Sequence, residues 1–342
     1  MNSPLLHLTM SRFRGFYREP SAVFWTFGFP ILLSIALGVA FRNRPPEPAY
    51  VAVERGDGAD ALLASLQKDK NIHAKILDPD EAHQSLRTGK VALVIVPGPP
   101  RTYRYDPMRP ESRLARALAD DAVQRADGRR DATVTSDAPV TEPGSRYIDF
   151  LIPGLIGMNL MSGGMWGVGY VIVEMRTRKL MKRLMATPMR RTHFLSSFLL
   201  MRGIVLAVEL PILLAFAWFV FKIGVRGSVP LLLLLTVLGS LAFAGLGLLV
   251  ASRAKNTQTV GGLMNLVMMP MFVFSGVFFS SAHFPDIMQP FIRALPLTAL
   301  NDSMRAVMID GAGLQQVATP AAIMAAWGLV CFGAALRIFR WR

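Results

Sequence analysis

Six long apolar runs, separated by polar segments, dominate the pattern of this sequence. The first is 23–41, and the others lie at about 148–173, 198–221, 229–251, 260–280 and 317–339. Each run is close to the roughly 20 residues that an α-helix needs to cross a hydrocarbon core about 30 Å thick. The pattern therefore predicts an α-helical polytopic membrane protein with six transmembrane helices, five of them in a membrane domain at 147–342.

The segment before the first run is amphipathic. Within residues 1–22, Arg12, Arg14 and Arg18 are interspersed with Leu, Met, Phe and Tyr residues, which indicates a helix lying at the membrane interface. A signal peptide cleaved after Ala40 is the alternative. We favour a retained first span at 23–41, because this run exceeds the roughly 7–15 apolar residues that are usual in a signal peptide.

Residues 42–146 have a different pattern, polar and rich in turn signals. Predicted strands begin near Val51 and cover Ile72–Leu77 and Val91–Val96, and predicted helices cover Ala61–Leu66 and start at Pro79 and Pro110. The continuous apolar run Val91–Val96 is typical of a strand buried on both faces. About 105 residues are enough for a small core. We therefore predict an α/β domain inserted between the first and second spans.

A strongly basic segment, Glu174–Arg191, joins the second and third apolar runs. It holds seven of the 37 Lys and Arg residues of the chain. Leu180 and Leu184 are four residues apart, so at helical spacing they lie on one face, opposite the basic side chains. This indicates a short amphipathic helix at a membrane surface, which ends before Pro188.

Composition and charge fix the sidedness of this arrangement. The chain is 52% hydrophobic and has a formal net charge of +14, but only +1 of that charge falls within 42–146. The rest lies around the apolar runs, so it indicates topology rather than nucleic-acid binding. With 174–191 inside, the inner segments carry 15 Lys and Arg residues against four in the short outer loops. We therefore expect a cell inner (cytoplasmic) membrane location, cytoplasmic termini and an external α/β domain.

The segment 281–316, before the last apolar run, is broken. Pro285, Pro290 and Pro296 divide it into pieces too short to span a membrane. Irregular backbone at membrane depth is tolerated where protein or trapped water satisfies it, so we expect short helices dipping into the outer leaflet. The only cysteine, Cys331, permits neither an internal disulfide nor a cysteine-based metal site.

The sequence offers little for catalysis. It lacks the GxxxxGK[ST], GxSxG and HExxH motifs, and its five histidines have no metal-ligand spacing. We expect no catalytic residue, metal or cofactor in this chain. Glu209 stands out, because a carboxylate within a span is costly unless it is paired or faces water. Either Arg202 and Glu209 line a gate or cavity, or Arg202 extends to the cytoplasm while Glu209 accepts hydrogen bonds from another span.

Further candidates for a translocation path are weaker. Asn159, Ser162 and Asn265 are polar residues within spans, where such residues more often join helices than contact a ligand. Met268, Met269 and Phe272 would form an adaptable cavity wall, or pack against neighbouring helices or lipid. Gly163 and Gly167 form a GxxxG motif that predicts close helix contact.

Two groups of residues stand out together. The first is Glu174, Arg176, Leu184, Thr187 and Pro188, and the second, before the last span, is Ser275-Gly276-Val277-Phe278-Phe279, Phe284-Pro285, Leu295-Pro296-Leu297, Asp302, Arg305 and Gly311. With the order of the spans, they resemble a known family, the permease subunits of type 2 ABC (ATP-binding cassette) exporters, in particular the subgroup with a large external domain after the first span. The likeness covers nearly the whole chain. The sequence departs from the family at Lys179, where many members have Gly.

This resemblance implies that 174–191 is a coupling loop seated on a separate ABC ATPase subunit, which binds ATP and Mg²⁺. It also implies a homodimer or heterodimer of permeases that exports a hydrophobic or amphipathic substrate, with the second and fifth spans along the path. The expected coupling residues are Glu174, Arg176, Arg178, Lys179, Leu180, Lys182, Arg183, Leu184, Thr187 and Pro188. The external domain would meet an external partner or shape the exit.

Three alternatives remain. A proton-coupled secondary transporter would use Glu209, and a membrane receptor would bind a ligand through the external domain. The basic loop by itself would also suit anionic lipid.

Overall fold

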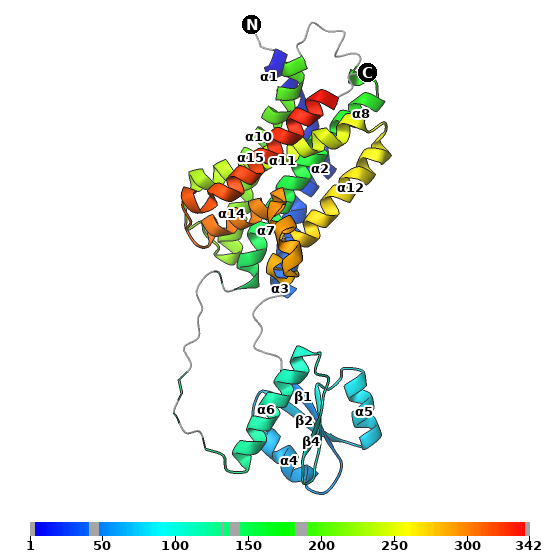
Figure 1. Cartoon of the computed structure of the whole chain (residues 1–342), viewed down its shortest axis with the longest axis vertical. Coiled ribbons are helices and arrows are strands. Elements are labelled where there is room, and N and C mark those ends of the chain that lie inside the picture. Colours follow the sequence, from blue (N-terminus) through cyan, green and yellow to red (C-terminus); the bar gives the residue numbers. More distant parts are fainter. Residues whose placement is uncertain are drawn as a thin grey trace. The chain divides into compact units, whose positions relative to one another are not determined.

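The computed structural model describes residues 4–40, 48–130, 146–181 and 191–338, together with Thr133, Thr135, Ser136 and Gly144. The chain divides into two compact units (Figure 1). The helical unit comprises Met1–Arg42 and Val140–Arg342, and the sheet unit comprises Asn43–Pro139.

Six helical stretches of the helical unit, within the described residues, are long and apolar enough to cross a membrane. They are Pro20–Ala40, Tyr147–Thr177, Ser196–Phe221, Val229–Arg253, Thr257–Phe274 and Leu314–Ile338. The six spans predicted from the apolar runs are confirmed at this level. An additional helix, α1 (Pro4–Tyr17), precedes the first stretch, in the segment predicted to be an amphipathic helix.

The first two stretches contain π-helical turns. The first consists of α2 (Pro20–Val23), η1 (Phe24–Gly28) and α3 (Phe29–Ala40). The second consists of α7 (Tyr147–Gly164), η2 (Met165–Tyr170) and α8 (Val171–Thr177). The other four are α10 (Arg191–Phe221), α11 (Val229–Arg253), α12 (Thr257–Phe274) and α15 (Leu314–Ile338). Short π-helical insertions of this kind are frequent at functional sites.

Small residues bring the helices around α11 together. Gly164 of α7 lies against Phe243 and Ala244, where an added Cβ would approach the Phe243 Cβ to 2.7 Å. Gly245 of α11 lies against Gly328 and Cys331 of α15. The predicted GxxxG motif is therefore only partly involved: Gly163 contacts the Arg202 guanidinium, whereas a Cβ at Gly167 would meet no described atom within 4 Å.

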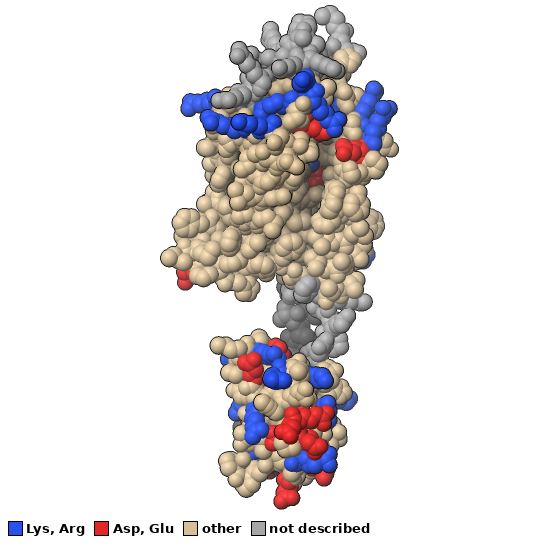
Figure 2. All heavy atoms as spheres, turned by 90° about the vertical axis from the view of Figure 1, so that its right-hand side faces the viewer, with Lys and Arg blue, Asp and Glu red and all other residues tan. Residues whose placement is uncertain are grey.

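Basic side chains gather at one end of the helical unit, here called the basic end (Figure 2). Arg176 of α8 contacts the C-terminal end of α11, next to Arg253. At the opposite end, Gly38 of α3 lies beside Ile148 of α7, where a Cβ would be 3.4 Å from the Ile148 Cδ1. The first span therefore ends next to the start of the second.

The segment between α12 and α15 consists of short helices, as its prolines predict. They are η3 (Ser281–His283), η4 (Asp286–Met288), α13 (Gln289–Ala294) and α14 (Pro296–Met308). Ten residues of α14 are buried, among them Leu300 and Met304, which are fully buried in the helical core. The segment thus contributes to the core of the unit.

The described residues of the sheet unit form a four-stranded sheet in the order β2-β1-β3-β4. The strands are β1 (Ala49–Glu54), β2 (Ile72–Leu77), β3 (Leu93–Val96) and β4 (Thr102–Arg104). The first three are parallel, with Val51 opposite both Ala74 and Leu93, and β4 is antiparallel to β3.

Helices cover both faces of this sheet (Figure 1). They are α4 (Ala59–Leu66), α5 (Pro79–Arg87) and α6 (Pro110–Ala126). Leu93 and Ile95 of β3 pack with α4 and α6, whereas Val94 packs with α5. Burial on both faces confirms the prediction for this strand, and the other elements predicted here form close to their expected positions. The three residues of β4 were not predicted.

The contact between α7 and α11 generates a first prediction. Gly164→Ala should reduce the free energy of unfolding by about 1–3 kcal/mol, because the new methyl group would press on the backbone of α11. Gly167→Ala, three residues away and facing open space among the described residues, should have little effect. Thermal unfolding in detergent is followed with a thiol-reactive dye. Cys331, the only cysteine, is buried, so it reacts with the dye when the protein unfolds. Equal stability of the two variants would contradict this packing.

Candidate functional site

A buried ion pair lies in the middle of the helical unit. Nη1 of Arg202 is 2.8 Å from Oε2 of Glu209, and the two residues are only 6% and 1% exposed. Both belong to α10, seven residues apart, so two helical turns bring them onto nearly the same face. The pair neutralises two charges that would each be costly to bury alone.

Neighbouring helices supply further partners of this pair, although Nη2 of Arg202 is buried without a hydrogen-bond partner among the described residues. Nδ2 of Asn159 donates to Oε1 of Glu209 and to the carbonyl oxygen of Thr26, each at 2.8 Å. Nε of Arg202 donates to Oγ of Ser240 at 3.3 Å. Thr26 lies in the π-helical turn η1, and Pro30, four residues later, has no N–H to form an α-helical bond with its carbonyl. We call these five residues, Thr26, Asn159, Arg202, Glu209 and Ser240, the polar network.

The polar network joins the first four spans. It bears on the two alternatives given above for Arg202 and Glu209. Arg202 does not extend to the membrane surface, because it pairs with Glu209, and Glu209 does accept a hydrogen bond from another span. Gly163 makes room for the arginine, since a Cβ there would lie 2.7 Å from the guanidinium carbon. An additional methyl group at this position would displace Arg202 from Glu209.

The other path candidates lie apart from the polar network. Ser162 is half-buried on α7, and the described residues show no hydrogen bond from its side chain to the network. Met268 is buried in the helical core and Phe272 packs against it. Asn265 and Met269 are exposed on the opposite face of α12. They line an open groove of about 500 Å³ with Gly262, Leu266, Pro270, Val273 and Phe274.

The start of the basic loop differs from the predicted single helix. Glu174 and Arg178 form an ion pair of 2.7 Å, but α8 ends at Thr177 and Lys179 has a left-handed backbone with φ of 57°. The expectation that a helix runs unbroken from Glu174 past Leu180 is therefore wrong. Glycine adopts this conformation without the steric penalty that a side chain carries, which is a physical reason for a Gly at this position.

Two contacts anchor the described part of this loop. Nη1 of Arg176 donates to the carbonyl oxygens of Ala251 and Ala254, at 3.2 and 3.0 Å, so a cation lies at the C-terminal end of α11. Met181 is buried, whereas Leu180 is 38% exposed. The remaining predicted coupling residues, Lys182, Arg183, Leu184, Thr187 and Pro188, lie outside the described residues.

A second cluster, at the end opposite the basic end, joins α14 to α7. Arg305 donates through Nε to the carbonyl oxygen of Phe150 at 3.2 Å, through Nη2 to the carbonyl oxygen of Gly276, and stacks on the Phe150 ring at 3.7 Å. Gly276 has a φ of 67°, which favours glycine. These contacts explain why Gly276 and Arg305 occur together in the second motif.

Asn301 completes this cluster, and the sequence did not single it out. Its Nδ2 donates to the carbonyl oxygen of Ser275 at 2.8 Å, and the residue is fully buried. Gly157 of α7 lies directly against Asn301, so that an added Cβ would overlap Oδ1. In the sequence Asn301 begins the polar run Asn301-Asp302-Ser303 and therefore does not stand out, and its partner is a backbone carbonyl that no residue type reveals.

Comparison with known proteins identifies similar sequences. Residues 20–337 match the model of the family described as ABC-2 family transporter protein. The chain is 29% identical over 174 residues, half of its length, to ABC transporter G family member 20 of Dictyostelium discoideum. It is 27% identical over 121 residues to the inner membrane transport permease YhhJ of Escherichia coli. It is also 23% identical over 203 residues, 58% of its length, to nodulation protein J of Bradyrhizobium diazoefficiens.

The length covered differs among these relatives. The aligned region spans 24% of the Dictyostelium protein, 32% of the E. coli protein and 76% of the Bradyrhizobium protein. The E. coli match covers 35% of the present chain.

The polar network generates a second prediction. Arg202→Met and Glu209→Gln should each reduce the free energy of unfolding by about 3–5 kcal/mol, because each leaves its partner buried without a counter-charge. The double variant should lose less than the sum of the two, by about 2–3 kcal/mol. Thermal unfolding in detergent measures all three, with Arg253→Met, at an exposed arginine, as the control. Strictly additive losses would show that the pair is not coupled.

Proposed function

This chain belongs to the ABC-2 family of transporter proteins, and we propose that it is the permease subunit of an ABC exporter whose ATP is hydrolysed by a separate subunit. The observation that carries the proposal is the basic loop that starts at α8. The loop directly joins two spans and begins with an anchored turn. A partner bound there would move both spans.

The direction of each span supports this assignment. Arg176, near the end of the second span, donates to the Ala251 and Ala254 carbonyls at the end of the fourth, so these two spans end together at the basic end. Loops rich in Lys and Arg stay in the cytoplasm, so we assign the basic end to the cytoplasmic side and the sheet unit to the outside. The printed name of the E. coli relative, an inner membrane permease, is consistent with a cytoplasmic-membrane location.

Coupling would pass from the ATPase through the loop into the spans. The Arg176 contact with the C-terminal end of α11 links the start of the loop to a third span. Because Arg202 and Asn159 connect α10 to α7 and α11, a displacement at the loop would reach the middle of the unit through rigid helices. ATP and Mg²⁺ would bind to the partner subunit.

The path is assigned to the second and fifth spans of two permease copies, identical or different. The exposed face of α12, with Asn265 beside Met269, suits this role, because an amide facing lipid is unfavourable. A cavity between copies would satisfy it. We propose a hydrophobic or amphipathic substrate on the same ground, since the groove along α12 is lined mainly by apolar residues.

The secondary-transporter alternative is less consistent with the polar network. A proton carrier must change its charge, but neutralising Glu209 would leave Arg202 buried without its counter-charge. The receptor alternative leaves the six spans and the short helices at 281–308 without a role.

The loop provides a third prediction. Arg183→Glu combined with Leu184→Glu should reduce recovery of an ATPase with the tagged protein at least ten-fold, because both changes oppose a basic, apolar contact surface. The measurement is a mild-detergent pull-down from the native membrane, with mass spectrometry and ATPase activity of the eluate. Arg226→Glu, at an exposed position of the opposite end, is the matched control and should leave recovery unchanged.

Two outcomes would contradict the proposal. If the unmodified protein recovers no ATPase, the secondary transporter or the receptor becomes the better assignment. If the loop variant recovers ATPase as well as the control does, the coupling role of 174–191 is wrong even though the complex exists.

A further inference from the structure

The strand order of the sheet unit leaves a crevice at one edge. In the order β2-β1-β3, the chain passes from β1 to one neighbour through α4 and returns past β1 to the other through α5. The strand order therefore reverses between β1 and β3, and because these two strands are parallel, the loops that follow them lie at the same edge of the sheet. Ligands of open α/β sheets bind at such a topological switch point.

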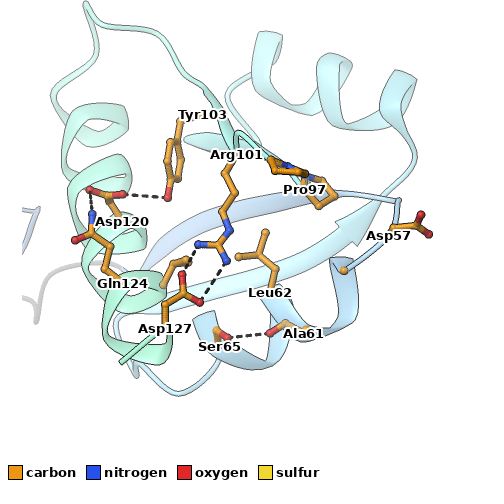
Figure 3. Close-up of a pocket in the computed structure, with 14 residues that line it drawn as sticks. Asp57, Ala61, Leu62, Ser65, Pro97, Arg101, Tyr103, Asp120, Gln124 and Asp127 are labelled. Carbon is orange, nitrogen blue, oxygen red and sulfur yellow. Dashed lines mark hydrogen bonds and ion pairs between the residues drawn. The ribbon is translucent and has the colours of Figure 1, made fainter. Parts of the chain in front are cut away.

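A cleft of about 630 Å³ lies at this edge, on the face covered by α4 and α6 (Figure 3). Its size is that of pockets for drug-sized molecules. The loop residues Gly58 and Gly98, with φ of 83° and 136°, form part of its wall. A Cβ at either glycine would meet no described atom within 4 Å, so the wall is open to a ligand at both positions.

One carboxylate is held in a fixed orientation in this cleft by neutral groups. Oη of Tyr103 donates to Oδ1 of Asp120 at 3.1 Å, and Nε2 of Gln124 donates to Oδ2 at 3.0 Å (Figure 3). Burial raises the pKa of Tyr103, and the Asp120 carboxylate raises it further, so the phenol stays protonated and keeps donating. The described residues show no basic side chain in ion-pair contact with Asp120.

The other charges leave the cleft negative. Arg101 is paired with Asp127, with Nη1 2.5 Å from Oδ2, and Asp57 lies at the rim away from Asp120 (Figure 3). The lining thus holds three carboxylates and one guanidinium. A second guanidinium, that of Arg116, lies outside the lining, 5.3 Å from the centre of the Tyr103 ring. An anionic ligand could use Arg101 only by displacing Asp127 and would still meet the other two carboxylates, so the charges favour a cation.

The rest of the cleft is apolar. Leu62 and Val123 are buried beneath it, and Pro97 and Pro99 form its loop side. We propose that this cleft binds a small amphipathic organic cation, with a positively charged N–H group at Asp120 and an apolar body over Leu62 and Val123. The site lies outside the transmembrane helices, and binding to it requires no ATPase, so it stands or falls separately from the permease assignment.

The test uses the full chain in an uncharged maltoside detergent and two dyes that share a xanthene ring system. Rhodamine 6G is a cation and fluorescein is an anion at neutral pH. Fluorescence polarisation should show saturable binding of rhodamine 6G, with fluorescein at least ten-fold weaker. Asp120→Asn should weaken rhodamine 6G binding at least ten-fold, because it removes the charge and keeps the side-chain size.

Two matched variants separate the cleft from dye taken up by the spans. Ala61→Trp would fill the cleft from α4, whereas Ala64→Trp lies on the same helix, is exposed and does not line the cleft. Glu81→Gln, on α5, removes one exposed carboxylate away from the cleft and is the control for charge. Ala61→Trp should abolish the saturable component, and Ala64→Trp and Glu81→Gln should leave it intact.

The proposal is overturned if rhodamine 6G shows no saturable binding, or if Ala61→Trp and Asp120→Asn bind it as the unmodified protein does. Equal affinity for fluorescein would overturn the charge assignment. If Ala61→Trp unfolds at the same temperature as the unmodified protein, misfolding is excluded as the cause of lost rhodamine 6G binding. If Ala61→Trp does not fold, the binding of Asp120→Asn, changed at a half-buried position, tests the proposal by itself.

Discussion

The arrangement of the spans depends on the burial of two opposite charges in a medium that supplies no water. Arg202 and Glu209 satisfy each other, but neither is complete without a third group, and those groups come from different helices. Asn159 connects Glu209 to the backbone of the first span, and Ser240 connects Arg202 to the fourth. Because any displacement of these helices leaves a polar group unsatisfied, the network favours one arrangement over others that bury the same apolar area. Apolar packing alone is far less selective.

Close contacts between helix backbones also fix the arrangement of the spans. Gly164, Gly245 and Gly157 each remove a side chain where another helix must approach, and their neighbours are a phenylalanine, a second glycine and the Asn301 amide. The helical unit is thus held by polar groups in its centre, by small residues around α11, and by the Arg305 and Asn301 contacts to backbone carbonyls at the end opposite the basic end. The start of the basic loop is held separately, by the contact of Arg176 with the C-terminal end of α11.

Much of this could be predicted from the sequence, for reasons specific to each feature. The spans follow from the length of the apolar runs, and the strands and helices of the sheet unit follow from short periodic segments bounded by Gly and Pro. Glu209 and Arg202 stood out because charges within a span are rare. The amides of Asn159 and Asn301 donate to the backbone carbonyls of Thr26 and Ser275, and a sequence does not display which carbonyls accept such bonds. The break at Lys179 was not predicted, because Leu180 and Leu184 suit a continuous helix, whereas the left-handed conformation of Lys179 carries no pattern of its own. The strand β4 is too short to show alternation.

The proximity of Gly38 to Ile148 has a consequence for how such a chain can change over generations. The chain leaves the first span and begins the second at neighbouring points of the helical unit. These two span ends pack together whatever sequence lies between them. A gene could lengthen, shorten or exchange this insert without rethreading any helix through the bilayer. The helical unit and the sheet unit are therefore free to diversify at different rates.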